Sequence, residues 1–313
     1  MPDQSGQYPY GPGRFGATLA QALADGPLLF DGATGTELER RGLDCGLPLW
    51  SSRALLEAPE AVEAIHREYV AAGVDCLTAN TFRTQAHVLR KAGLGSRALE
   101  LSRLAVDLAR RAAQDRPGVR VAGSAAPLED CYRPDRVPPE DTLEREHGQH
   151  CDALAAGGAD WILVETMGTV REARAAAKAA QSTGLPVLVS LIGAASGPRL
   201  LSGEPAEAAI EALIPLSPAA LLVNCMPAGR VDPWLSVLRD SGLPFGISPN
   251  LGAPGADPAA ARSDDLTPAA FAERAAGWAA AGARLIGGCC GTRPAHLRAA
   301  HAALSGRPHG ERE

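Results

Sequence analysis

The chain has 313 residues, of which 46% are hydrophobic and 21% charged, the composition of a globular protein with a sizeable core. Its net charge of −6 and its scattered Lys and Arg residues give no electrostatic reason to expect nucleic acid or an anionic membrane as a partner. No apolar run reaches the roughly 18 residues that span a bilayer, and the N-terminus lacks the pattern of a signal peptide. We therefore expect a cytoplasmic protein that acts on small molecules. The sequence does not indicate an oligomeric state.

The composition is even along the chain apart from its ends. Residues 1–20 are rich in Gly, Pro and polar residues, and we expect them to be disordered. Neither a long linker nor a shift in composition divides the part that follows. We therefore expect residues 21–305 to form one domain and residues 306–313 to form a tail.

Short apolar runs alternate with longer amphipathic stretches throughout this domain. The helical stretches include 58–73, 96–113 and 167–184, and several of the helical stretches close with a glycine. The apolar runs are nearly continuous, which is typical of parallel strands that are covered on both faces. The expected strands are 28–32, 75–80, 119–125, 160–166, 186–193, 220–225, 244–250 and 284–290.

Eight alternating β and α units predict a parallel sheet. At this length they favour a closed (β/α)8 TIM barrel, which typically takes about 250 residues. An open dinucleotide-binding sheet would need a GxGxxG turn after its first strand, and the turn at 32–36 does not supply one. The sequence therefore predicts a single-domain α/β barrel.

The seven cysteines fall into two groups. A disulfide framework is not expected in a reducing compartment. We expect four of the cysteines to be small buried apolar residues. These are Cys45, Cys76, Cys131 and Cys151. The other three, Cys225, Cys289 and Cys290, stand at the ends of the sixth and eighth expected strands.

The carboxyl ends of the strands form the active site of an α/β barrel. Three thiolates held there can take three positions of a tetrahedral zinc site and leave the fourth open, as in a catalytic centre. Adjacent cysteines cannot both face inward from a regular strand, so we expect the neighbouring glycines to allow an irregular backbone. Spacing alone leaves open that Cys289 and Cys290 merely pack at a strand end. The strand ends also carry Asp31, Asn80, Thr81, Ser124, Glu165 and Asn250.

Five segments in order resemble the homocysteine S-methyltransferase family. GGCCGTRPAHL (287–297) is the most specific, and DGATGTELERRG (31–42) is also strong. VNCMP (223–227), TANTF (78–82) and LVETM (163–167) resemble further motifs of the family. The resemblance covers nearly the whole chain.

This resemblance implies a (β/α)8 barrel that binds one Zn²⁺ through Cys225, Cys289 and Cys290. It implies transfer of a methyl group to the zinc-bound thiolate of L-homocysteine, which gives methionine. Asp31 and Glu165 match acidic residues that hold the amino group of homocysteine. Asn80 and Thr81 are expected to add hydrogen bonds to the same amino acid.

The methyl donor is predicted by comparing subgroups. Betaine-using members resemble a pattern with tyrosines where this chain has Arg83 and Thr166. Aromatic rings suit a quaternary ammonium, and Arg83 would repel a cationic donor unless it points outward. Betaine is therefore disfavoured. The PLW element with Trp50 resembles members that use S-methylmethionine or S-adenosylmethionine, so we expect a sulfonium donor.

Several alternatives remain open at this stage. TANTF and GISPN, which ends at Asn250, look closer to the homocysteine-binding module of methionine synthases. Such a module would take its methyl group from a corrinoid or folate partner. Trp50, Arg83 and Asn250 are the candidates for the donor side. Another thiol acceptor, or a non-catalytic sensor that binds zinc and homocysteine, would fit the same residues.

Overall fold

The computed structural model describes residues 19–252 and 266–305. Eight strands in this part of the chain form one sheet in the order β1-β8-β7-β6-β5-β4-β3-β2, and all neighbours are parallel. A parallel bridge between Phe30 and Cys76 joins the two ends of the sheet and closes the barrel. The strands are β1 (Leu28–Leu29), β2 (Cys76–Ala79), β3 (Arg120–Ala125), β4 (Trp161–Met167), β5 (Val187–Leu191), β6 (Ala220–Pro227), β7 (Phe245–Asn250) and β8 (Leu285–Ile286). The prediction of a (β/α)8 barrel is confirmed.

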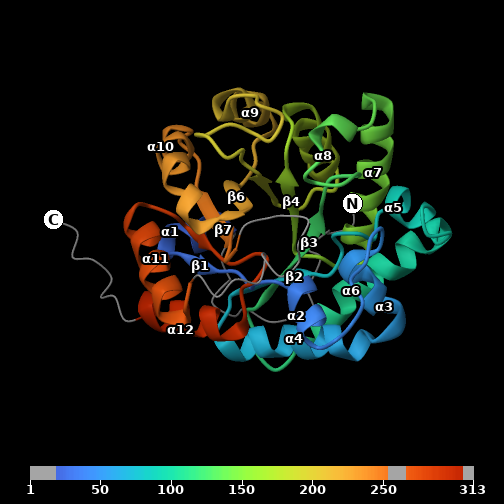
Figure 1. The fold of residues 1–313 in the computed structure, drawn as a ribbon, viewed down its shortest axis with the longest axis horizontal. Coiled ribbons are helices and arrows are strands. Elements are labelled where there is room, and N and C mark those ends of the chain that lie inside the picture. The colour runs from blue at the N-terminus through green and yellow to red at the C-terminus, as the bar shows by residue number, and fades with distance from the viewer. Residues whose placement is uncertain (1–18, 253–265, 306–313) are drawn as a thin grey trace, which may run out of the picture.

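Helices surround the strands (Figure 1). In the described ranges they are α1 (Leu19–Asp25), α2 (Gly35–Arg40), α3 (Ala54–Glu57), α4 (Pro59–Ala72), α5 (Ala86–Arg90), α6 (Ala98–Ala113), α7 (Glu140–Ala156), α8 (Val170–Gln181), α9 (Ala206–Leu213), α10 (Asp232–Asp240), α11 (Pro268–Ala280) and α12 (Pro294–Ser305). Helix α1 begins at Leu19, two residues before the expected start of the domain, and residues 1–18 and 306–313 lie outside the described residues. No helix in the described part is long and apolar enough to cross a bilayer.

Helix α8 shows why one predicted boundary moved. The helix was expected from residue 167, but Met167 still belongs to β4. Thr169 then adopts an extended conformation, and its side chain accepts a hydrogen bond from the backbone N–H of Glu172. This side-chain cap satisfies a free donor of the first turn and sets the start of the helix at Val170.

The interior of the barrel is packed at the end where the strands begin. Leu28, Leu188 and Leu285 belong to one buried cluster, in which the rings of Phe30 and Trp161 stack with their centroids 6.1 Å apart. Leu19 and Leu23 of α1 belong to the same cluster. Because this end is filled by apolar side chains, the carboxyl ends of the strands remain as the place for a cavity.

Strands β1 and β8 are shorter than expected, since their carboxyl ends bond to each other outside the regular ladder. The backbone N–H of Gly288 donates to the carbonyl of Asp31 at 3.0 Å. The N–H of Ala33 donates to the Thr292 hydroxyl at 3.1 Å, and the N–H of Gly291 donates to the Thr36 hydroxyl at 3.0 Å. The first and last sequence motifs are therefore joined into one irregular corner of the barrel.

Candidate active site and metal centre

A cavity of about 1060 Å³ opens at the carboxyl ends of the strands. All eight strands or the segments directly after them contribute side chains to it. The loops after β1 and β3 form the rest of its lining, with residues 42–47, Trp50 and residues 130–132. Most of the polar residues predicted at the strand ends meet in this one space.

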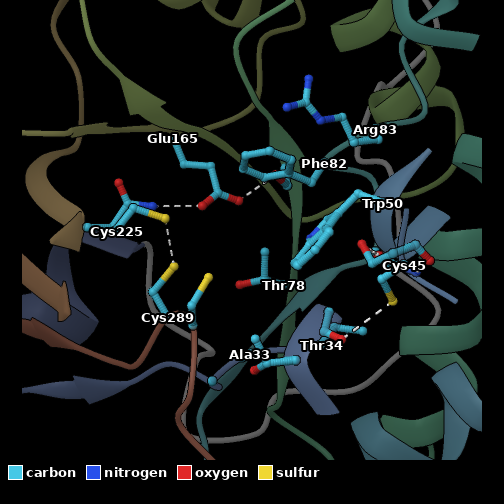
Figure 2. A pocket seen from close by; sticks show the side chains of 18 of the residues that line it. Ala33, Thr34, Cys45, Trp50, Thr78, Phe82, Arg83, Glu165, Cys225 and Cys289 are labelled. Atoms are coloured by element: carbon cyan, nitrogen blue, oxygen red, sulfur yellow. Dashed lines mark hydrogen bonds between the residues drawn. The ribbon is translucent and has the colours of Figure 1, made fainter. Parts of the chain in front are cut away.

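Three cysteines meet at one side of the cavity. The sulfur atoms of Cys225, Cys289 and Cys290 all lie within 4.8 Å of one another, and Cys225 Sγ is 2.9 Å from Cys289 Sγ. Figure 2 shows Cys225 and Cys289 facing each other, the first from β6 and the second from the segment after β8. Cys225 is buried, whereas the other two are half-buried. The structure thus brings the three predicted ligands together.

The backbone is irregular on both sides of this cluster. The ladder between β6 and β7 shifts register after Asn224, and Cys225 has a φ of 55°, in the left-handed region. Such a bulge redirects the side chain that it carries. Residues 287–290 follow β8 without regular strand pairing, so Cys289 and Cys290 can both contribute a sulfur atom to the cluster.

The glycines before the cysteine pair serve mainly to make room. A Cβ on Gly288 would overlap the side chain of Thr292, and a Cβ on Gly287 would lie 2.8 Å from that of Phe30. Of the three glycines in GGCCG, only Gly291 has a positive φ, 87°. The predicted irregular backbone is therefore present, but close packing rather than φ explains two of its three glycines.

The thiol cluster fits a divalent metal ion. Sulfur atoms that ligate one zinc ion at about 2.3 Å are necessarily within a few ångströms of each other, as here. Without a cation, hydrogen bonds to Cys289 and Cys290 hold the pKa of Cys225 well above its usual value. Hydrogen bonds from Cys225 and Cys289 hold the pKa of Cys290 well below it. The cluster therefore tolerates one negative charge alone, and a bound cation would allow three.

Two buried carboxylates face the same cavity. Asp31 lies 3% exposed after β1, and its Oδ2 accepts a hydrogen bond from the N–H of Thr78 at 2.9 Å. Glu165 accepts hydrogen bonds from the Ser124 hydroxyl and from Asn224 Nδ2. Burial raises the pKa of Asp31 to about 8 and that of Glu165 to about 7. A cationic ligand group would restore the ionised form of both.

Three other residues predicted for the site form hydrogen bonds to other parts of the protein. Thr81 is fully buried, and its hydroxyl bonds to the backbone carbonyl and N–H of Ser124, so it joins β2 to β3 outside the cavity lining. Asn250 is also fully buried, and its Oδ1 accepts the N–H of Cys290 at 3.0 Å. Asn80 lines the cavity but exchanges two hydrogen bonds with Ser51, at 2.6 and 2.9 Å.

The donor-side candidates Trp50 and Arg83 point in different directions. Figure 2 shows the Trp50 ring reaching into the cavity and the Arg83 guanidinium directed away from the cysteines. Arg83 donates to the carbonyl of Glu129 at 2.8 Å, and its charge lies 5.3 Å from the centre of the Phe82 ring. A Cβ on Gly35 would lie 2.6 Å from the Trp50 indole, so this glycine of the first motif makes room for the ring.

The remaining cysteines mostly follow the expectation of burial. Cys76 and Cys151 are fully buried and Cys45 is 7% exposed, but Cys131 is half-buried in the cavity lining. Sequence reasoning missed Asn224 and Ser190, which line the cavity beside Glu165. The position of Asn224 directly before Cys225 in the VNCMP segment was the available signal.

The fold and site define a (β/α)8 barrel enzyme with a cluster of three cysteines that could hold a metal ion. The family model for homocysteine S-methyltransferase matches residues 28–304. The chain therefore belongs to the homocysteine S-methyltransferase family, whose members are methyltransferases that transfer a methyl group to homocysteine.

Relatives agree with this assignment. The chain is 29% identical to homocysteine S-methyltransferase YbgG of Bacillus subtilis, over 87% of this chain and 92% of that protein. It is 31% identical to methionine synthase of Mycobacterium tuberculosis, over 94% of this chain but 26% of that enzyme. The metallated structure of homocysteine methyltransferase MmuM from Escherichia coli is 30% identical, with a TM-score of 0.77, over 88% of this chain and 96% of that one.

Proposed function

We propose that this protein transfers a methyl group from a sulfonium donor, S-methylmethionine or S-adenosylmethionine, to a zinc-bound L-homocysteine thiolate and so forms methionine. The carrying observation is that three cysteine sulfurs and two buried carboxylates open into one cavity. The cysteines suit a metal and its thiolate ligand, whereas the carboxylates suit an ammonium group. An amino acid with a thiol side chain fits both the cysteine cluster and the pair of carboxylates.

The acceptor is held through its amino group. Asp31 and Glu165 are both raised in pKa by burial, so each prefers a cationic partner in order to ionise. The homocysteine ammonium is such a partner. Once it is bound, the carboxylates fix the amino acid so that its side chain extends toward Cys225, Cys289 and Cys290.

Zn²⁺ is the metal that the donor set favours, because three thiolates with an open position are typical of catalytic zinc. When bound, it supplies deprotonation of a thiol whose free pKa is about 8.5. In the transfer, a bond forms between the homocysteine sulfur and the methyl carbon while the bond from that carbon to the sulfonium breaks. The electron pair stays on the leaving sulfur, which becomes a neutral thioether.

The charge of the cavity supports a cationic donor. Besides the two carboxylates assigned to the acceptor, Glu39, Asp44 and Asp130 line it, and Arg83 is the single basic residue among the described lining. Arg83 is 6% exposed and stacks on Phe82, so its charge is directed away from the cysteines. The aromatic side chains of Trp50, Phe82 and Tyr132 also line the cavity and suit a sulfonium. A polyanionic folate would meet a repulsive field instead.

The test loads the purified protein with zinc, measures its metal content, and incubates it with homocysteine and a panel of donors. The donors are S-methylmethionine, S-adenosylmethionine, betaine and a methyl-corrinoid, and methionine is the readout. We expect about one zinc per chain and methionine from a sulfonium donor. Methionine from the methyl-corrinoid alone would assign the chain to the donor class of methionine synthase, which matches it in sequence. Binding of zinc and homocysteine without transfer from any donor would indicate a sensor.

A further inference from the structure

Asn224 links the two functional ends of the cavity. It is 3% exposed, and its side-chain amide makes four hydrogen bonds. Its Oδ1 accepts from the Thr166 backbone N–H at 3.1 Å and from the Ser190 hydroxyl at 2.9 Å. Its Nδ2 donates to Glu165 Oε2 at 2.8 Å and to the Thr166 hydroxyl at 2.9 Å. These bonds use the whole hydrogen-bonding capacity of an amide.

The chemistry of the partners fixes the direction of this amide. The backbone N–H of Thr166 can only donate, so the amide oxygen faces it. An ionised Glu165 can only accept, so the amide nitrogen faces the carboxylate. An aspartate at position 224 would set two carboxylates against each other, and a leucine would leave the partners unsatisfied. Among residues of this size, asparagine alone satisfies both sides.

The same amide lies between two irregular strands. The ladder between β4 and β5 shifts register between Val164 and Met167, and Thr166 has a φ of 61°, which is rare for a β-branched residue. Cys225, with its φ of 55°, directly follows Asn224. Non-glycine residues remain in this region only where the surroundings hold them. The hydrogen bond from the Thr166 N–H to Asn224 is one such constraint.

We propose that Asn224 is a positioning residue that holds the Glu165 carboxylate at a fixed distance from the Cys225 thiolate. Because Glu165 anchors the ammonium and Cys225 belongs to the metal centre, this distance selects an acceptor whose amino group and thiol are separated as in homocysteine. The inference rests on the proposed function for the identity of the acceptor. It adds that specificity for the amino group depends on a residue that is itself neither charged nor a ligand.

The test compares two thiols that differ in one group. Homocysteine and 4-mercaptobutyrate share the carboxylate, the carbon chain and the thiol, but 4-mercaptobutyrate lacks the amino group. Calorimetry measures their Kd values for the zinc-loaded wild type, N224L and the milder N224S, and metal content is measured in parallel. We expect homocysteine binding to weaken about 10-fold in N224L and less in N224S, with 4-mercaptobutyrate binding and zinc content unchanged.

A double-mutant cycle with Glu165 separates positioning from general damage. If Asn224 acts through Glu165, N224L has no further effect on homocysteine binding in an E165Q background. Ser102→Ala, which removes a buried hydroxyl pair with Thr84 outside the cavity lining, is the matched control and keeps the wild-type preference. Where N224L does not fold, N224S takes its place in the cycle.

The inference would be overturned by an equal loss of affinity for both thiols or by additive effects of N224L and E165Q. Loss of zinc from N224S with an unchanged preference between the thiols would also overturn it, since Asn224 would then support only the cysteines. Failure of the proposed function looks different, because the wild type itself would then not prefer homocysteine to 4-mercaptobutyrate.

Discussion

The two walls of the cavity are built in different ways. The inner wall is formed by side chains at the strand ends, and its members bond to neighbouring strands, as Glu165 does with Ser124 and Asn224. The outer wall is formed by the loops after β1 and β3, where Trp50 is placed by packing on Gly35. Under the proposed function, the barrel itself would therefore fix the acceptor side, whereas loops would shape the donor side. Loops can change in sequence while the barrel is kept.

Removal of a predicted metal ligand from the inner wall should have the largest effect. We expect C290S to lose its zinc and to lower kcat/KM by about 10³-fold or more, because stabilisation of the thiolate is worth several kcal/mol. Metal content and methionine formation measure this together. C151A, which alters a fully buried thiol of the outer core, is the control and should keep its zinc. Full activity in C290S would remove Cys290 from the ligand set.

The carboxylates of the inner wall should affect the acceptor rather than the donor. We expect D31N and E165Q each to raise KM for homocysteine about 10- to 100-fold, because each loses a charged hydrogen bond to the ammonium. KM for the sulfonium should change less. Steady-state kinetics with each substrate varied in turn check this separation. A larger increase in the donor KM than in the homocysteine KM would indicate that the inner wall binds the donor.

Burial of Asp31 should also make stability depend on pH. Its pKa is raised to about 8 in the folded protein, so the ligand-free folded state binds a proton more tightly than the unfolded chain does. Stability from this group is present below about pH 4 and is lost as the pH rises toward 8. We expect D31N to reduce the loss of unfolding free energy between pH 5 and pH 8 by about 1–3 kcal/mol. Urea unfolding at both pH values measures it, and equal slopes for wild type and D31N would contradict it.

The inner wall could be predicted because the sequence pattern shows where each strand ends. An apolar run followed by Asp31, Glu165 or Cys225 places each side chain at the rim of a barrel, and barrel closure then brings them together. The family resemblance added the identity of the acceptor. The irregular backbone at the cysteine pair was also expected. The contact by which the side chain of Thr292, in the same motif, makes glycine necessary at position 288 could not be predicted.

The polar residues directly after β2 were less predictable, because their partners come from distant segments of the chain. Asn80 and Thr81 were both predicted to add hydrogen bonds to the amino acid. In the structure the Thr81 hydroxyl bonds to the backbone of Ser124 and the Asn80 amide bonds to Ser51. Adjacent residues with similar polarity thus have different partners. Only the positions of the neighbouring strand and loop decide which polar group faces the cavity.

In the outer wall, Trp50 should act on the donor alone. The ring reaches into the cavity, and loss of a cation–π contact with a sulfonium should raise the donor KM about tenfold in W50A. The Kd for homocysteine, measured without a donor, should stay at the wild-type value. W50F retains an aromatic face and should recover most of the loss. If W50A weakens homocysteine binding as strongly as donor binding, the two walls do not each bind a separate substrate.

The smallest effect is expected at Asn80, where the two walls touch. Asn80 directly follows β2, but its amide is bonded to Ser51, the residue after Trp50. We expect N80A to release this loop and to raise the donor KM about threefold, since two neutral hydrogen bonds are lost. The Kd for homocysteine should not change if Asn80 serves the loop. If N80A instead weakens homocysteine binding and leaves the donor KM unchanged, Asn80 contacts the substrate as the family resemblance implies. Asn80 would then belong to the inner wall.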